Sequence, residues 1–178
     1  MIPFDFIQLN MVTLSNNISA SDRTAFSSIL ESSGYFYDFE VDVALSLLDE
    51  SIAKGQKESG YYWIKIIDND KIVGFAVFGP NPCTTHSWDL YWIAIHEQMR
   101  NKHLGAFLLK AVEESVEDKM GRIIWIETSG RPLYEPTQHF YIKNGYELHA
   151  FLKDYYGVDD DKLVFRKEIS PTSSSKKK

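Results

Sequence analysis

The sequence has 178 residues, of which 44% are hydrophobic and 25% charged, so it has the composition of one ordinary globular domain and is too short for two well-packed ones. The net charge of −6 argues against non-specific nucleic-acid binding, and no apolar run approaches the roughly 20 residues of a membrane-spanning helix. A single cysteine, Cys83, excludes an internal disulfide, and the N-terminal residues lack the pattern of a secretory signal. We therefore expect a cytoplasmic protein with one domain over residues 1–169 and a disordered Ser/Lys-rich tail over 170–178.

The first third of the chain predicts a short strand followed by two helices. A weak strand pattern covers 6–14, and the segment Ser19–Asp22 is similar to a capping box that begins a helix. Gly34 is a suitable residue to end that helix. Asp38 is expected to cap a second helix, which ends before Gly55.

The middle of the chain changes from helical to alternating periodicity. Segments 61–67 and 71–78, separated by an Asp-Asn-Asp turn, predict an antiparallel hairpin. Residues 88–95 predict the next strand, because aromatic and β-branched side chains suit a half-buried pleated surface. A polar turn over 96–103 leads into an amphipathic helix that starts near Leu104. Such a turn leaves backbone N–H groups unpaired at the start of the helix, where they can bind an anion.

The last third of the chain predicts one strand, a short helix and two more strands, over 122–128, 136–143, 146–155 and 162–169. The element order β-α-α-β-β-β-α-β-α-β-β predicts the α/β class, with one mixed sheet of about seven strands and helices on both faces. The unit over 88–128 should be a right-handed parallel crossover.

Two motifs resemble the GNAT superfamily of N-acetyltransferases. The segment Arg100–Gly105 is similar to the family signature, which is Arg or Gln, two residues, Gly, one residue, then Gly or Ala, between the fourth strand and the third helix. The segment Phe140–Glu147 resembles the family's later block, a helix that ends in an aromatic–Tyr pair followed by Gly–aromatic. The element order is similar from about Asp22 to Glu168. The resemblance implies a GNAT-like, mostly antiparallel sheet with a parallel central pair, and transfer of an acetyl group from acetyl-coenzyme A to an amine.

The resemblance also assigns the residues that would hold acetyl-coenzyme A, through backbone groups at the end of the strand and in the turn before the helix. They are Ile93, Ala94, Ile95, Arg100, Asn101, Lys102, His103, Leu104, Gly105 and Ala106. His103 stands where the family usually has its first glycine, and it is compatible with the turn if its φ angle is negative. Its imidazole is either a phosphate contact or an exposed side chain of the turn.

The resemblance identifies Tyr141 as the general acid that protonates the departing thiolate of coenzyme A, although spacing alone indicates a core aromatic at a helix end. Asp89 is the candidate base for the attacking amine. Glu127 on the next strand is the competing carboxylate, and a chain of waters is the third alternative. Strict alternation along the strand would place Asp89 on the same face as Ile93.

Aromatic residues in the connections are candidates for the wall of an acceptor cleft. They are Tyr35, Phe36, Tyr37, Tyr61, Tyr62 and Tyr134. The acceptor is expected to be an amine of a small molecule or a peptide, and the acidic net charge favours a cationic one. We expect no metal site, because the five histidines show no metal-ligand spacing, and neither a nucleic-acid nor a membrane partner. An exposed edge strand would allow a homodimer.

Two other functions fit the same motifs. A non-catalytic domain that binds acyl-coenzyme A as a sensor would keep the anion-binding turn and need neither Tyr141 nor a base. A partner-binding module with an eroded cofactor site would keep only the fold. Turnover of acetyl-coenzyme A in the presence of amines separates the enzyme from both.

Overall fold

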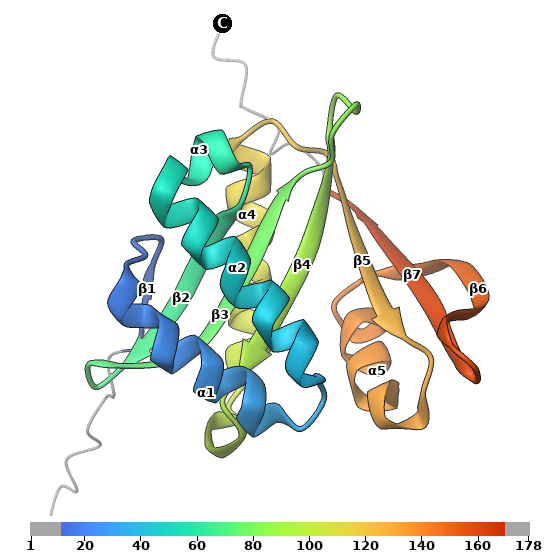
Figure 1. Ribbon diagram of the computed structural model, residues 1–178. Helices are drawn as coiled ribbons and strands as arrows, with labels where there is room; N and C mark the ends of the chain where they lie inside the picture. The colour runs from blue at the N-terminus through green and yellow to red at the C-terminus, as the bar shows by residue number, and fades with distance from the viewer. Residues whose placement is uncertain (1–11, 170–178) are drawn as a thin grey trace, which may run out of the picture.

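Seven strands form one sheet in the order β1-β2-β3-β4-β5-β7-β6 (Figure 1). The computed structural model describes residues 12–169. The strands are β1 Thr13–Ser15, β2 Tyr62–Asp68, β3 Lys71–Pro80, β4 Ser87–Ile95, β5 Ile123–Ser129, β6 Glu147–Gly157 and β7 Asp160–Glu168. Every neighbouring pair is antiparallel except β4 and β5. The predicted mixed sheet with a parallel central pair is therefore confirmed, whereas most of the strand predicted over 6–14 lies outside the described residues.

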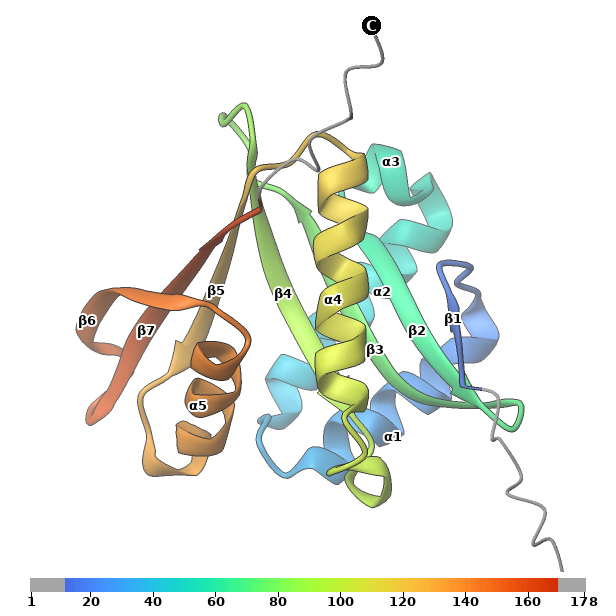
Figure 2. The same cartoon turned by 180° about the vertical axis from the view of Figure 1, so that it is seen from behind.

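Helices cover both faces of this sheet (Figures 1 and 2). The helices α1 Arg23–Ser33, α2 Asp38–Lys54 and α3 Gln56–Ser59 lie on one face, and α4 Leu104–Asp118 and α5 Glu135–Lys143 lie on the other. Each face has its own apolar core. Phe26 and Leu48 pack with Trp63 of the sheet on the α1–α2 face, whereas Leu108 packs with Ile126 on the α4–α5 face.

Local capping chemistry positions the first two helices. Before α1, the Asp22 carboxylate accepts a hydrogen bond from the backbone N–H of Ser19 at 2.9 Å, as the capping pattern predicts. The N-cap of α2 is Tyr37 rather than Asp38, so this part of the prediction was wrong by one residue. The Glu40 side chain accepts from the backbone N–H of Tyr37 at 2.8 Å, which satisfies the helix end without a carboxylate at the cap itself.

A β-bulge in β4 changes which side chains face each core. Val77 pairs with Trp92 and Phe78 pairs with Leu90, so Tyr91 is an extra residue with no partner on β3. As a result, Tyr91 and Trp92 both pack toward the α1–α2 core, while Leu90 and Ile93 pack toward the α4–α5 core. Strict alternation fails at this point.

The strands β4 and β5 separate after a short region of pairing. Their parallel register runs from Ser87 with Ile123 to Leu90 with Ile126 and then stops. The rest of β4 remains paired with β3, and the rest of β5 remains paired with β7. Figure 1 shows the two strands diverging toward α5. The segment of β4 from 91 to 95 therefore has backbone groups on its β5 side without a strand partner.

Candidate active site

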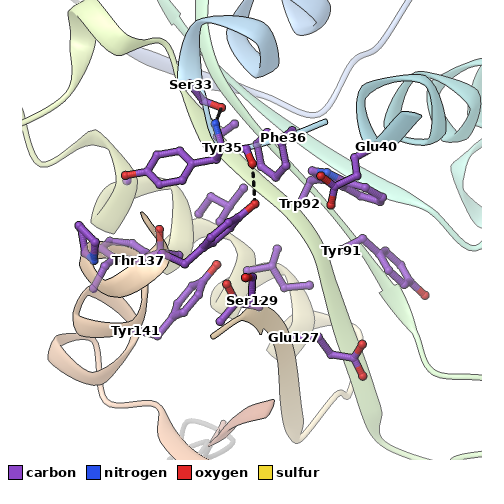
Figure 3. A pocket seen from close by; sticks show the side chains of 18 of the residues that line it. Ser33, Tyr35, Phe36, Glu40, Tyr91, Trp92, Glu127, Ser129, Thr137 and Tyr141 are labelled. Carbon is purple, nitrogen blue, oxygen red and sulfur yellow. Dashed lines mark hydrogen bonds between the residues drawn. The ribbon is translucent and has the colours of Figure 1, made fainter. Parts of the chain in front are cut away.

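A cleft of about 1380 Å³ occupies the gap between β4 and β5. Its walls come from the α1–α2 connection, the turn before α4, helix α5 and the turn between β6 and β7. Because the gap passes between the strands, side chains from both faces of the sheet line one cleft. Figure 3 shows this arrangement, with Tyr141 of α5 on one side and Tyr91 of β4 on another.

The turn between β4 and α4 has a backbone that suits an anion. A short 3-10 turn over Glu97–Met99 precedes it, and α4 begins at Leu104 as predicted. Asn101 and His103 both adopt left-handed conformations, with φ of 61° and 59°. Because successive residues then alternate in handedness, their N–H groups can converge on a phosphate at the helix N-terminus.

The left-handed conformation of His103 contradicts the expectation from the sequence that its φ angle is negative. A negative φ was expected to make histidine acceptable at the glycine position, whereas the observed φ of 59° is the conformation for which glycine is favoured. The chain therefore keeps the glycine-like backbone and accepts the strain of a Cβ. Histidine is among the residues that adopt this region more often than most, so the strain is moderate.

Nine of the ten residues expected to hold the cofactor line the cleft, and Lys102 does not. The Lys102 ammonium instead lies 3.4 Å from the sulfur of Met99. Arg100 lines the cleft, but its guanidinium donates to the backbone carbonyl of Ser33 at 2.8 Å and lies 5.2 Å from the centre of the Tyr35 ring. In this structure its side chain holds the end of α1, rather than projecting freely into the turn.

Tyr141 is 5% exposed and lines the cleft from α5. Its ring packs between Phe140, Tyr146 and Phe165, and its hydroxyl has no hydrogen-bond partner among residues 12–169. Burial, followed by the nearby Tyr134, raises the pKa of the Tyr141 phenol above its ordinary value. The phenol is therefore protonated at neutral pH, with its proton free to be donated into the cleft.

Asp89 lies on β4 opposite Trp125 of β5, on the α1–α2 face, because Trp88 and Leu90 face the other core. The expectation that it shares a face with Ile93 was wrong, because of the bulge between them. Asn81 donates to the Asp89 carboxylate at 2.8 Å. Burial raises the pKa of Asp89, the Asn81 hydrogen bond opposes this, and the charge of Glu127 adds to the rise. The carboxylate is therefore more basic than an exposed aspartate.

Glu127, the competing carboxylate, also lines the cleft but is already ion-paired. Lys162 of β7 forms an ion pair with it at 2.8 Å, and the Lys162 ammonium lies 3.9 Å from the centre of the Tyr155 ring. About half of the Glu127 side chain is exposed. A carboxylate that is both paired and solvated is less suited than Asp89 to remove a proton.

Four of the six aromatic residues expected in the acceptor wall line the cleft, and Tyr61 and Tyr62 do not. Tyr61 instead packs edge-on against Tyr91, and Tyr62 packs against Trp88 on the α4–α5 face of the sheet. Several aromatic residues that the sequence pattern did not indicate also line the cleft. They are Phe39, Tyr91, Trp92, Trp125, Phe140, Tyr155 and Tyr156. The Tyr-Tyr pair before the acidic turn was the visible signal for the last two.

Arg131 was also missed, and it joins the two halves of the cleft. Its guanidinium forms an ion pair with Asp160 at 3.1 Å, donates to Ser129 and to the Tyr37 hydroxyl, and stacks over the Tyr37 ring. The Tyr134 hydroxyl donates to the backbone carbonyl of Tyr35 at 2.8 Å. These contacts fix the α1–α2 connection as one wall.

Comparisons with known proteins agree with this geometry. The model of the acetyltransferase (GNAT) family matches residues 25–146. A GNAT-family protein from Desulfovibrio desulfuricans has 35% sequence identity to the chain and a TM-score of 0.87, over 89% of this chain and 99% of its own. The chain has no match among the curated proteins. The protein belongs to the GNAT family of acetyltransferases, enzymes whose acetyl donor is acetyl-coenzyme A.

More distant structures share the fold alone. An aminoglycoside 6′-N-acetyltransferase complexed with coenzyme A has 20% identity and a TM-score of 0.72, over 90% of this chain and 98% of its own. The ribosomal-protein-S18-alanine N-acetyltransferase from Escherichia coli has 17% identity and a TM-score of 0.70, over 93% of this chain and 98% of its own. These two neighbours act on quite different amines, so the fold does not identify the acceptor of this chain.

The residues present fit acetyl-coenzyme A. The unpaired segment of β4 offers backbone groups to an amide-bearing arm, and the turn before α4 offers N–H groups to a pyrophosphate. Gly105 in the first turn of α4 faces the Phe140 ring, which a Cβ at this position would approach within 3.4 Å. Within residues 12–169 there is no cluster of three or more metal-ligating side chains, and no helix is long and apolar enough to cross a membrane.

Proposed function

We propose that the protein transfers the acetyl group of acetyl-coenzyme A directly to a primary amine of a small molecule or peptide. The observation that carries this proposal is the hydroxyl of the buried Tyr141 side chain, which has no protein partner among the described residues and opens into the cleft that the unpaired segment of β4 also lines. A domain that only bound acyl-coenzyme A would have no use for a protonated, unpaired phenol at this position. Acetyl-coenzyme A supplies the activated thioester.

The two faces of the sheet supply the two reactants. The turn before α4 and the end of β4 bind the cofactor from the α4–α5 face, through Ile93–Ile95 and Arg100–Ala106. The acceptor enters from the α1–α2 face, where Asp89 lies. Direct transfer requires both reactants in one complex, and the gap between β4 and β5 allows them to meet.

Asp89 accepts a proton from the acceptor ammonium, directly or through a water, and so makes the amine nucleophilic. With acetyl-coenzyme A bound, the amine nitrogen would bond to the acetyl carbon as the carbon–sulfur bond breaks, and the unpaired backbone N–H groups of β4 would stabilise the negative charge on the carbonyl oxygen. The Tyr141 hydroxyl donates its proton to the departing sulfur, and the proton that the newly bonded nitrogen loses to become an amide returns to Tyr141 through water. No covalent enzyme intermediate is required.

The experiment that tests this function is a screen of amines for release of free thiol from acetyl-coenzyme A. Monoamines, diamines, aminoglycosides and peptide N-termini form the panel, and calorimetry measures coenzyme A binding separately. Amine-dependent thiol release is the expected result. Binding of coenzyme A without turnover of any amine would refute the enzyme and indicate the sensor.

Two further proposals concern the cellular compartment and the oligomeric state of the protein. Cys83 is exposed and unpaired, which suits the reducing cytoplasm. Strand β6 is at the edge of the sheet and all of its residues are exposed, so the predicted homodimer would use this edge. Light scattering after size exclusion would test the dimer, and a monomer at all concentrations would reject it.

A further inference from the structure

The acceptor half of the cleft contains more negative than positive charge. Glu40 of α2, Asp89 of β4, Glu127 of β5 and Asp160 of β7 all line it. Arg131 is the lining cation on this side, and its charge is already paired with Asp160 at 3.1 Å. The other lining cations, Arg100 and Lys143, come from the turn before α4 and from α5. Three carboxylates remain after the Arg131 pair is set aside.

These three carboxylates share one cation. Lys162 pairs with Glu127 at 2.8 Å, whereas Glu40 and Asp89 form no ion pair with any residue of 12–169. Their other contacts are with neutral donors, the backbone N–H of Tyr37 for Glu40 and the side-chain amide of Asn81 for Asp89. With all carboxylates ionised at neutral pH, this half of the cleft therefore has an uncompensated negative charge of about two, from Glu40 and Asp89.

The carboxylates act on the same region of space. Tyr156 lies near the end of β6 and is about half exposed, at 48%. Partial burial is the largest cause that raises its pKa, and the charges of Glu127, Asp160 and Glu40 add to the rise. Burial and then the charge of Asp89 raise the pKa of Tyr91 to about 12. In Figure 3, Glu40, Tyr91 and Glu127 lie on one side of the pocket, away from Tyr141.

The surfaces between the carboxylates are aromatic. Tyr37 and Phe39 stack with ring centres 5.6 Å apart next to Glu40, and Tyr156 lies within reach of the charges of both Glu40 and Glu127. Aromatic faces bind ammonium groups through their negative potential and also pack against the methylene groups that connect them. A carboxylate-bearing or uncharged acceptor would leave this side without a partner.

We infer that the acceptor is an amine with at least two positive charges, whose reacting amine lies at Asp89 and whose second ammonium lies between Glu127 and Glu40. This inference rests on the proposed acetyl transfer. The second ammonium supplies the positive charge that the protein lacks between Glu127 and Glu40. The unpartnered hydroxyl of the buried Tyr141 side chain opens into the same cleft. Acetylation removes the charge of the reacting amine, while the distal ammonium keeps its charge. The site therefore selects among amine acceptors by the distal ammonium, which does not react.

The test compares three compounds of equal length at each chain length from diaminopropane to diaminohexane: the α,ω-diamine, the monoamine with a methyl group at the far end, and the ω-amino acid. The best diamine should have a kcat/KM at least about tenfold above its monoamine, with the amino acid lowest. Equal kcat/KM for diamine and monoamine, or a preference for the amino acid, would overturn the inference. Thiol release only with monoamines, or only with peptides that lack a second ammonium, would overturn it too, while leaving the acetyltransferase function in place. No release with any amine would refute both.

Two variants locate the second ammonium. Glu127→Gln and Glu40→Gln should each reduce the ratio of diamine to monoamine kcat/KM by about five-fold or more. Glu40→Gln is the cleaner variant, because glutamine can still accept from the Tyr37 N–H, whereas Glu127→Gln removes the partner of the buried Lys162. Asp42→Asn is the matched control, since Asp42 is exposed on the same helix and does not line the cleft. An unchanged ratio in Glu40→Gln and Glu127→Gln would place the second charge elsewhere and overturn the assignment.

Discussion

The substitution Tyr141→Phe removes one hydroxyl from the cleft and leaves the ring in place. The ring packs against Phe140, Tyr146 and Phe165, so the core loses no apolar contact. Because the hydroxyl has no partner among the described residues, its removal leaves no other buried group unsatisfied. The free energy of unfolding should therefore change by less than about 0.5 kcal/mol.

The catalytic effect should be much larger. If Tyr141 protonates the departing sulfur, its loss should lower kcat by about ten- to a thousand-fold, which is about 1.4 to 4 kcal/mol of activation free energy. Affinity for coenzyme A should change little, since the backbone groups of β4 and of the turn remain. Because burial raises the pKa of Tyr141, the wild-type enzyme should keep its acid form throughout the neutral range, and the ratio between variant and wild type should not vary there.

The assay measures thiol release at saturating acetyl-coenzyme A, with calorimetry for cofactor binding and thermal unfolding for stability. Tyr146→Phe is the matched control, because Tyr146 is buried beside Tyr141 but does not line the cleft. The Tyr146 hydroxyl has no hydrogen bond of acceptable geometry among the described residues, although the Glu113 carboxylate is close enough to raise its pKa further after burial. Its loss should leave turnover unchanged and stability equal or higher. Unchanged turnover in Tyr141→Phe would remove this residue from the mechanism.

Substitutions at three other positions should change activity or stability. Asp89→Asn should lower kcat/KM at least about tenfold. Because the folded-state pKa of Asp89 is raised, ionisation of its carboxyl costs stability as the pH rises, so the variant should be more stable than the wild type at neutral pH and equally stable in acid. A difference in thermal midpoint that does not depend on pH would contradict this. His103→Gly should raise the midpoint of thermal unfolding by about 1–4 °C, since relief of the left-handed strain exceeds the added flexibility of the unfolded chain, and a lowered midpoint would show that the imidazole makes a stabilising contact. Lys65→Met should cost about 3–5 kcal/mol in denaturant unfolding, because it leaves the buried Asp22 without its 2.7 Å partner, and adding Asp22→Asn should recover part of that loss if the unpaired charge is the cause.

The element order, and most of the turn residues that line the cleft before α4, could be predicted from the sequence because they depend on local patterns. The capping carboxylate of Asp22, the left-handed cap at Gly34 and the start of α4 at Leu104 each follow from residues within a few positions. The Tyr141 block was equally local, since it lies within one helix and its end.

The acceptor side could not be read in this way, because it is assembled from segments far apart in the chain. Arg131 meets Tyr37 across 94 positions, and neither neighbourhood contains a sign of the other. The bulge at Tyr91 is invisible because β-branched and aromatic residues occupy both faces of β4, so alternation gives no signal where the register slips. The positive φ of His103 was missed because the residue type argued for the opposite conformation.

The extra residue at Tyr91 makes β4 unequally sensitive to loss of a single amino acid. Deleting Tyr91 would join Leu90 to Trp92 in ordinary alternation, and every other side chain of the strand would keep the face that it has now. Deleting Asp89 or Ile93 would instead move the side chains of one half of the strand to the opposite face of the sheet, so that apolar side chains would enter a core that they do not fit. The bulge is thus the position in this strand where the chain could have gained a residue without rebuilding its interior, and the residue gained lines the cleft between β4 and β5.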